Sequence, residues 1–117
     1  MADPEFLKGL TSSRELEITV MGRKSGRSIS TPVWFVHESG NLYLLPVKGS
    51  DSDWYKNVTA KPEMQISAKG RKVTVKANSG SDPDKVKEVV EKFRSKYGAG
   101  EIRRYYSKLD AAIEVSI

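Results

Sequence analysis

The chain has 117 residues and a mass of 13.0 kDa, which is the size of a single domain with one hydrophobic core. Its 20 Lys and Arg residues outnumber its 15 Asp and Glu residues, and the net charge of +5 favours an anionic partner such as a phosphate, an acidic cofactor, a nucleic acid or a lipid headgroup. The sequence has no cysteine and one histidine, which excludes disulfides, thiolate zinc sites, iron–sulfur clusters, a cysteine nucleophile and a multi-histidine metal site.

We expect no secretory signal at the N-terminus. Residues 1–13 are interpreted as an N-terminal extension and residues 14–117 as the domain; residues 1–6 fit either a native start or an expression scar. They lack a basic segment followed by an apolar run, and no apolar run in the chain approaches the ~20 residues of a membrane-spanning helix. We therefore expect a cytoplasmic protein with no transmembrane segment.

The first half of the chain predicts strands joined by turns. Residues 16–20 alternate apolar and polar side chains, which predicts a half-buried strand. A second strand is expected at 31–36, where Pro32 belongs at the start of the strand or at a sheet edge. A turn with Gly and Asn then leads into a third strand at 42–45, as in a hairpin.

A short helix and two more strands follow. The helix is expected over residues 54–60, with Ser52 or Asp53 as its N-cap and Pro62 as its stop. Strands are predicted at 64–68 and 72–77, and the Ser-Gly-Ser sequence at 79–81 is expected to end the second of them.

The clearest helix begins at Pro83, after Asp82 as N-cap, and ends at Gly98. Its apolar residues recur at helical spacing: they are Val86, Val89, Val90, Phe93 and Tyr97. A second short helix at 101–108 and a final strand at 112–117 complete the chain. Six strands joined mainly by hairpins, with two to three short helices, indicate an α+β fold around a mainly antiparallel sheet that closes or partly closes into a barrel.

The most informative segment is the basic loop, residues 22–28. Arg23, Lys24 and Arg27 are close together there with no acidic residue nearby, so they could grip the oxygens of a phosphate. Gly22 and Gly26 allow the backbone to approach a ligand, and the N–H groups of such a turn can form an anion-binding nest. The spacing is that of neither a Walker A motif nor a dinucleotide fingerprint. A solvated basic turn is the alternative that the residues leave open.

Aromatic residues mark two further candidate positions. Trp54 and Tyr55 fall in the first turn of the short helix, where free N–H groups favour an anion and an aromatic ring can stack on a flat ligand. From the residues alone, the favoured interpretation is that both rings anchor the helix to the barrel. Trp34 and Phe35 are neighbours on one strand, so one is expected to face the core and the other a groove or a neighbouring element.

Four of these segments together resemble the deazaflavin-dependent nitroreductase family. They are LEITVMGRKSG at 16–26, TPVWF at 31–35, DWYKN at 53–57 and AKP at 60–62, and the resemblance extends over residues 15–117. Members of that family are flavin-reductase-like oxidoreductases related in fold to pyridoxamine phosphate oxidase. The resemblance implies a six-stranded split β-barrel of the FMN-binding type.

The resemblance also implies binding of the deazaflavin coenzyme F-420, whose phosphodiester and glutamyl tail suit a chain with surplus cations. The cofactor-binding residues that it implies are Arg23, Lys24, Ser25, Gly26, Arg27, Ser28, Pro32, Val33, Trp34, Lys48, Gly49, Trp54, Tyr55 and Asn57. Tyr105 and Tyr106 are the catalytic candidates, because either could donate a proton or hold the acceptor. No metal is expected.

The expected activity is hydride transfer from reduced F-420 to a small enone, quinone or nitro compound, by a monomer or a homodimer. One alternative is an FMN-binding split-barrel flavoprotein, because the phosphate of FMN suits the same loop. A more distant alternative is a basic nucleic-acid-binding barrel that contacts single strands through Trp34 and Tyr43. The F-420 hypothesis expects no nucleic acid partner.

Overall fold

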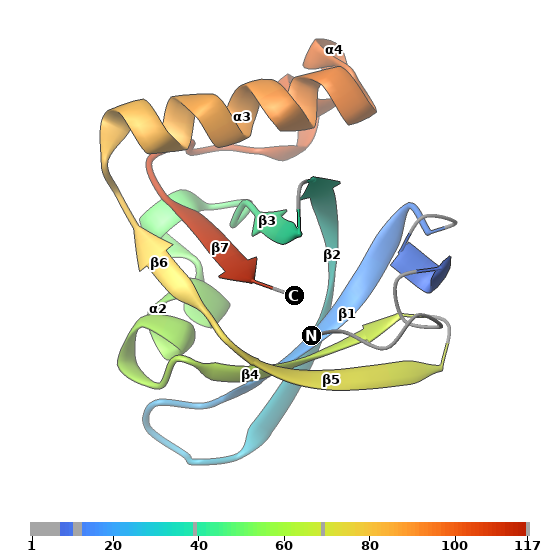
Figure 1. Ribbon diagram of the computed structural model, residues 1–117. Coiled ribbons are helices and arrows are strands. Elements are labelled where there is room, and N and C mark those ends of the chain that lie inside the picture. Colours follow the sequence, from blue (N-terminus) through green and yellow to red (C-terminus); the bar gives the residue numbers. More distant parts are fainter. Residues whose placement is uncertain (1–7, 11–12, 39, 69, 117) are drawn as a thin grey trace.

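The computed structural model describes residues 8–10, 13–38, 40–68 and 70–116, so residues 1–7 and 11–12 of the expected N-terminal extension lie outside it. The described strands form one antiparallel sheet in the order β5-β4-β1-β2-β3-β7-β6 (Figure 1). The elements are β1 (Glu15–Met21), β2 (Ser28–Glu38), β3 (Asn41–Leu44), η1 (Gly49–Asp51), α2 (Asp53–Ala60), β4 (Glu63–Ala68), β5 (Arg71–Lys76), β6 (Asn78–Gly80), α3 (Pro83–Tyr97), α4 (Ala99–Tyr105) and β7 (Ala112–Ser116).

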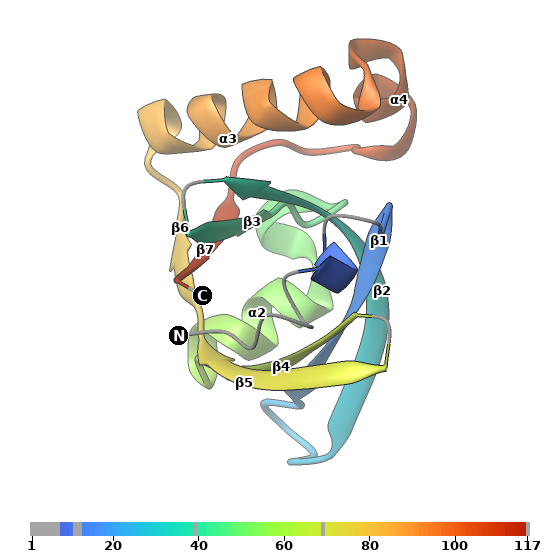
Figure 2. The same ribbon diagram turned by 45° about the vertical axis from the view of Figure 1, so that its right-hand side comes forward.

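Strand β2 curls the sheet because it belongs to both of its halves. Its residues up to Trp34 pair with β1, and its residues from Phe35 onward pair with β3. A strand that changes partners in this way makes a corner in the sheet. The curl brings β6 and β7 back toward β5, and Figure 2 looks along the resulting half-barrel.

The inside of the curl is the main core. Alternate strand residues point into it, including Ile18, Phe35, Leu42 and Ile66, each at most 1% exposed. Helix α2 lies across one end of the curl in Figure 2 and adds Val58 to the same core. Burying this face of the helix holds α2 against β1.

A second core lies outside the curl, under α3. The opposite faces of β2 and β3 supply Val36 and Tyr43, and α3 supplies Val89 and Phe93. Figure 1 shows α3 running across this outer face. The apolar stripe and the ends that the sequence predicts for α3 are confirmed, including Pro83 at its start and Gly98 as its C-cap, at φ 98°.

The α+β, mainly antiparallel architecture is confirmed, but the part of the chain that the structure describes has seven strands instead of six. The additional strand is β6, which occupies part of the segment expected to be a break. Its residues have low strand propensity, and β6 forms through its ladder with β7, a pairing that local sequence does not reveal. The second short helix also ends earlier than predicted, at Tyr105, because Ser107 donates its N–H to the carbonyl of Val47 at 2.9 Å.

None of the described helices is both long and apolar enough to cross a membrane.

Candidate functional site

A cleft of about 670 Å³ lies between β2, the loop after β3, the start of α2 and the end of α4. Most of its lining is apolar or aromatic, and both tryptophans of the chain contribute to it. The lining residues are Glu15, Ile29, Thr31, Pro32, Val33, Trp34, Leu45, Val47, Lys48, Ser52, Asp53, Trp54, Asn57, Tyr105 and Tyr106. A concave apolar surface with a few polar groups is the usual form of a small-molecule site.

One wall of the cleft is built from aromatic rings around Trp34. The Trp34 ring stacks on Tyr97 with centroids 4.4 Å apart and planes 9° from parallel. Tyr105 meets the Trp34 ring edge-on at 5.5 Å, and Tyr106 lies at 6.1 Å. Phe35 points the other way, into the inner core, so the expected division of these two neighbours between faces is confirmed. The stack gives Trp34 a fixed orientation.

The Tyr97 hydroxyl holds the corner of β2 on which Trp34 stands. It accepts the Phe35 backbone N–H at 3.0 Å, and it lies 2.8 Å from the Phe35 carbonyl and 2.7 Å from the Arg14 carbonyl, which it can donate to. Lys96 also donates to the Phe35 carbonyl, at 2.7 Å. Burial is the main cause that raises the pKa of Tyr97. The sequence indicated only an apolar stripe residue at this position, because the contact joins residues 62 apart.

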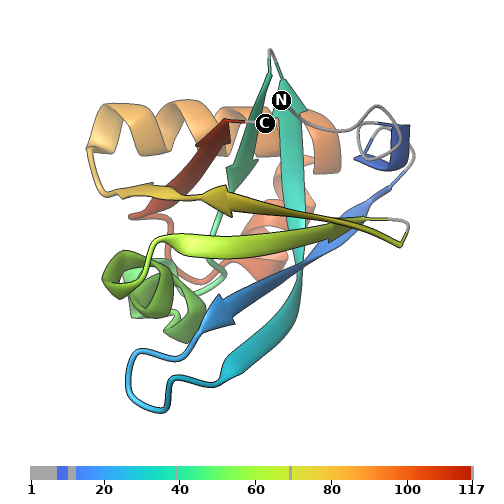
Figure 3. The ribbon, with the colours of Figure 1, turned by 60° about the horizontal axis from the view of Figure 1, so that its bottom comes forward.

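The basic loop packs against the start of α2. Arg23 donates to Asn57 Oδ1 twice, from its backbone N–H at 3.1 Å and from Nη1 at 2.7 Å. Nη1 also reaches the Asp53 carbonyl at 3.4 Å, and Nη2 lies 3.7 Å from Asp53 Oδ1. Figure 3 shows the turn between β1 and β2 beside α2. The contact brings the basic loop next to the helix turn that carries Trp54.

These contacts reduce the number of basic-loop cations that remain available to a ligand. Arg23 is committed to α2, whereas Lys24 and Arg27 are exposed and form no ion pair with any residue that the structure describes. Gly22 and Gly26 are hydrogen-bonded inside the loop, and the Arg27 N–H donates to Ser25 Oγ at 3.2 Å. Most of the expected nest of N–H groups is therefore used within the protein, and the cations left for an anion are Lys24 and Arg27.

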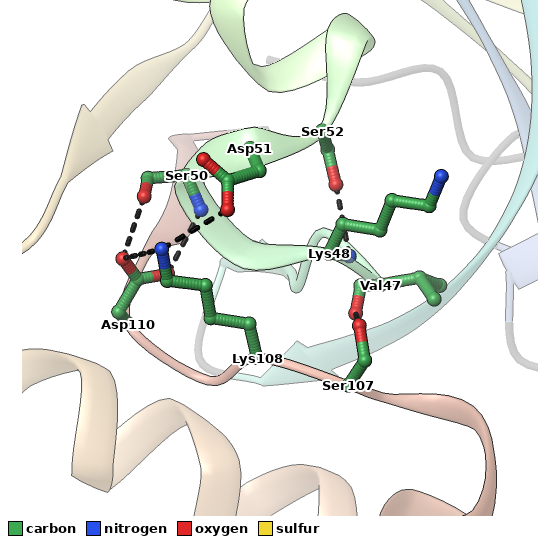
Figure 4. A network of polar contacts seen from close by, with 8 residues as sticks. All are labelled: Val47, Lys48, Ser50, Asp51, Ser52, Ser107, Lys108 and Asp110. Carbon is green, nitrogen blue, oxygen red and sulfur yellow. Dashed lines mark hydrogen bonds and ion pairs between the residues drawn. The ribbon is translucent and has the colours of Figure 1, made fainter.

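The loop after β3 is tied to the segment that follows α4 (Figure 4). Asp110 accepts the Ser50 backbone N–H at 2.8 Å and the Ser50 hydroxyl at 2.6 Å, and these bonds hold the pKa of Asp110 below its ordinary value. Lys108 bridges Asp51 at 3.1 Å and Asp110 at 3.7 Å, and the hydrogen bond to Asp51 raises the pKa of Lys108. The side chain of Lys48 points away from this network in Figure 4 and lines the cleft.

The structure divides the residues that the sequence singled out. The cleft is lined by Pro32, Val33, Trp34, Lys48, Trp54, Asn57, Tyr105 and Tyr106. The basic-loop residues Arg23, Lys24, Ser25, Gly26, Arg27 and Ser28 lie outside this lining, on the hairpin that packs against α2.

Two of the implied cofactor residues occupy structural positions. Gly49 is buried against Asp110, and Tyr55 belongs to the inner core, as the anchoring alternative expected. Neither lines the cleft, because close packing with neighbouring segments occupies their surroundings.

The two catalytic candidates differ in environment. Tyr105 is 48% exposed at the rim of the cleft, whereas Tyr106 is 7% exposed. Burial raises the pKa of Tyr106 well above its ordinary value, so its hydroxyl keeps its proton across the physiological range.

Glu15 and Val47 also line the cleft and were not singled out from the sequence. The one feature that points to Glu15 as a lining residue is the pairing of β1 with β2, in which Glu15 lies opposite Trp34. Among the described residues, no three His, Cys, Asp or Glu side chains are grouped so as to hold a metal ion.

Comparison with known proteins places the chain in a family. Residues 6–113 match the model described as "Uncharacterized protein conserved in bacteria (DUF2255)". The chain belongs to this family. Its description assigns no activity, so the function has to be argued from the site.

Solved structures of similar fold have low sequence identity to the chain. An F-420-H2 dependent reductase (FDR-A) is 21% identical, with a TM-score of 0.67 over 88% of this chain and 94% of that one. The heme storage protein HutZ from Vibrio cholerae is 12% identical, with a TM-score of 0.72 over 97% and 88% of the two chains. A putative pyridoxamine 5'-phosphate oxidase from Listeria innocua is 14% identical, with a TM-score of 0.67 over 95% and 89%. These likenesses show a split-barrel-like fold.

Proposed function

We propose that the protein is an oxidoreductase that binds a flavin-type cofactor in the cleft, with the deazaflavin F-420 preferred. The observation that carries the proposal is the contact between the basic loop and α2, through Arg23 and Asn57, beside a cleft lined by both tryptophans. It brings cations and a flat aromatic surface close together. A molecule with a planar ring and an anionic tail matches that combination.

The residues present fit such a cofactor. Trp34 and Trp54 offer ring surfaces, and a volume of about 670 Å³ lies within the usual ~300–1,000 Å³ range of ligand pockets. Lys48 adds one cation to the lining, while Lys24 and Arg27, on the adjacent hairpin, form no ion pair within the described parts of the chain. The fold is shared with a protein described as an F-420-H2 dependent reductase, which supports the same proposal.

A bound deazaflavin would supply the hydride for two-electron reduction of an enone, quinone or nitro compound. The chain itself binds and orients. Lys48 in the lining, with Lys24 and Arg27 on the neighbouring hairpin, would hold the anionic parts, and the aromatic residues would exclude water from the ring. Tyr105, half-exposed at the rim, is the better placed of the two tyrosines to donate a hydrogen bond to an acceptor, because Tyr106 is buried.

The direct test is titration of the purified protein with F-420 and, separately, with FMN. Both tryptophans line the cleft, so we expect saturable quenching of their fluorescence, with a lower dissociation constant for F-420 than for FMN. No saturable change with either cofactor overturns the proposal. Tighter binding of FMN replaces it with the flavoprotein alternative.

A matched pair of double variants tests the role of the free cations. Lys24→Ala with Arg27→Ala removes two charges beside α2, and each lost charge-assisted contact is worth about 1.5–3 kcal/mol, or at least about tenfold in the dissociation constant. Lys72→Ala with Lys76→Ala removes the same charge from β5, whose residues do not line the cleft. Equal weakening by both pairs indicates a general charge effect and contradicts the assignment.

Turnover and assembly complete the test. Reduced cofactor should be oxidised in the presence of a nitro compound or an enone at a rate that depends on the protein; a protein that binds but gives no turnover is a carrier.

A homodimer is one of the two expected states, and a solved chain of similar fold, 21% identical with a TM-score of 0.68, is described as a domain-swapped dimer. Light scattering at several concentrations distinguishes the two states.

A further inference from the structure

A carboxylate from the segment after α4 binds the loop after β3. Asp110 Oδ1 accepts the Ser50 backbone N–H at 2.8 Å, and Oδ2 accepts the Ser50 hydroxyl at 2.6 Å (Figure 4). Lys108 Nζ lies 3.1 Å from Asp51 and 3.7 Å from Asp110. We call these four residues, Ser50, Asp51, Lys108 and Asp110, the Asp110 network. None of them lines the cleft.

The same network ties together two parts of the cleft wall. On one side of it, Val47 and Lys48 line the cleft, and Lys48 is fixed by its N–H bond to Ser52 Oγ at 2.9 Å. On the other side, the segment 107–110 follows directly after Tyr105 and Tyr106, which also line the cleft. The position of Lys48 relative to the two tyrosines therefore depends on bonds that a ligand does not touch.

The loop after β3 and the segment 107–110 are closely packed at Gly49. Gly49 has φ 57° and faces Asp110 and Lys108 so closely that a Cβ atom would overlap Asp110 Oδ1 and lie 2.9 Å from the Lys108 carbonyl oxygen. Asp110 is 40% exposed at its side chain, so the tight contact lies on its Gly49 side, where a displaced carboxylate would press on the loop. A change at Asp110 should thus reach the loop that carries Lys48.

We propose that Asp110 is a positioning residue that sets the place of Lys48 relative to Tyr105 and Tyr106, and with it which ligands the cleft accepts. The ligand part of this inference rests on the proposed function. Asp110 acts through Ser50 and needs no contact with the ligand. The chemistry suits the role, because one carboxylate accepts two donors from a single residue and so fixes both its direction and its distance.

The decisive variant is Asp110→Asn, which keeps the size of the side chain but removes its negative charge and replaces one of its two acceptor oxygens with an NH₂ group. The side chain can then no longer accept both Ser50 donors or pair with Lys108. We expect F-420 to bind about two- to thirtyfold more weakly, as for other substitutions that act on a site without touching the ligand. We also expect a changed acrylamide quenching of the two cleft tryptophans in the protein without any cofactor. Glu114→Gln is the control, because it removes the carboxylate partner of Lys85, 2.9 Å away, on a strand outside the cleft lining.

A double-mutant cycle separates positioning from a general loss of structure. Ser50→Ala removes one of the two bonds to Asp110 and keeps the backbone N–H, so it should change quenching in the same direction but less. If Asp110 acts through Ser50, Asp110→Asn has a smaller effect on quenching in the Ser50→Ala protein than in the unchanged protein. Fully additive effects overturn the proposal. Ser50→Ala by itself also gives a measurable answer should Asp110→Asn not fold.

The failure of this inference differs from failure of the proposed function. If neither F-420 nor FMN binds the unchanged protein, the proposed function fails, and acrylamide quenching of Trp34 and Trp54 still decides the role of Asp110. If Asp110→Asn leaves quenching as in the unchanged protein, or Glu114→Gln changes it equally, Asp110 is not a positioning residue. A change confined to Asp110→Asn and Ser50→Ala, with the expected coupling, supports the inference.

Discussion

The corner of β2 can be tested by removing one oxygen atom, in the variant Tyr97→Phe. The change keeps the ring that stacks on Trp34 at 4.4 Å and removes the hydroxyl that accepts the Phe35 N–H at 3.0 Å. Phe35 is 1% exposed, so no water replaces the lost acceptor. The Phe35 carbonyl keeps its bond from Lys96, so the unsatisfied group on Phe35 is the N–H alone. The Arg14 carbonyl also loses its contact with the hydroxyl, at 2.7 Å, but Arg14 is an exposed residue.

The size of the effect follows from this count. A buried donor without a partner costs about 1–3 kcal/mol of unfolding free energy. For a chain of 117 residues, about 4 °C of melting temperature corresponds to each kcal/mol, which gives a loss of about 4–12 °C. Thermal unfolding followed by circular dichroism measures it, with Tyr105→Phe as the control. Tyr105 is 48% exposed, and removing its hydroxyl should change stability by no more than about 0.5 kcal/mol. Equal shifts for the two variants would refute the role assigned to the Tyr97 hydroxyl.

Three further predictions concern the elements that shape the cleft. Gly26→Ala should lower the free energy of unfolding by about 1–2 kcal/mol, the cost of a left-handed backbone conformation, since nothing lies within 4 Å of the new Cβ. Gly49→Ala should lower it more, because its Cβ overlaps Asp110. Similar urea midpoints for the two variants would contradict this. Asn57→Ala should lower the free energy of unfolding by about 1–3 kcal/mol, because the donors of Arg23 lose their acceptor. Asp53→Ala, at an 88% exposed side chain, should lower it by about 0–1 kcal/mol. The reverse order in urea unfolding would be inconsistent with the packing of the basic loop on α2. The pKa of Asp110 is lowered from 3.8, so the contribution of its carboxylate to stability is present above that pH and is lost as the pH falls through the lower pKa of the folded state. The melting temperature of Asp110→Asn should therefore fall less steeply below pH 3.8 than that of the unchanged protein. Equal slopes would contradict a stabilising role of the carboxylate.

The elements that the sequence predicted well are those with a local cause. Helix α3 has an N-cap, a proline at its first position, an apolar stripe and a terminal glycine, all within 17 residues of sequence, from Asp82 to Gly98. The alternation in β1 and β4 reflects one buried and one exposed face, so it can be read without knowing the partner strands. The basic loop and the Trp54 helix turn were likewise visible as composition.

The pairing of distant segments could not be predicted in this way. Strand β6 is three residues of Asn, Ser and Gly, and only its ladder with β7 makes it a strand. Arg23 looked like a free cation because nothing local reveals that Asn57, 34 residues away, accepts its donors. Asp110 and Ser50 carry no motif, and their contact spans 60 residues.

The order of residues alone determined the types of the other elements besides β6, the surplus of cations and the absence of cysteine chemistry, because each depends on neighbours in the chain or on counting. The tertiary structure decided which cations remain unpaired, which aromatic rings line the cleft and how the cleft walls are tied together. Those properties depend on side-chain distances between segments far apart in sequence, and such distances are fixed only when the sheet curls and both cores pack.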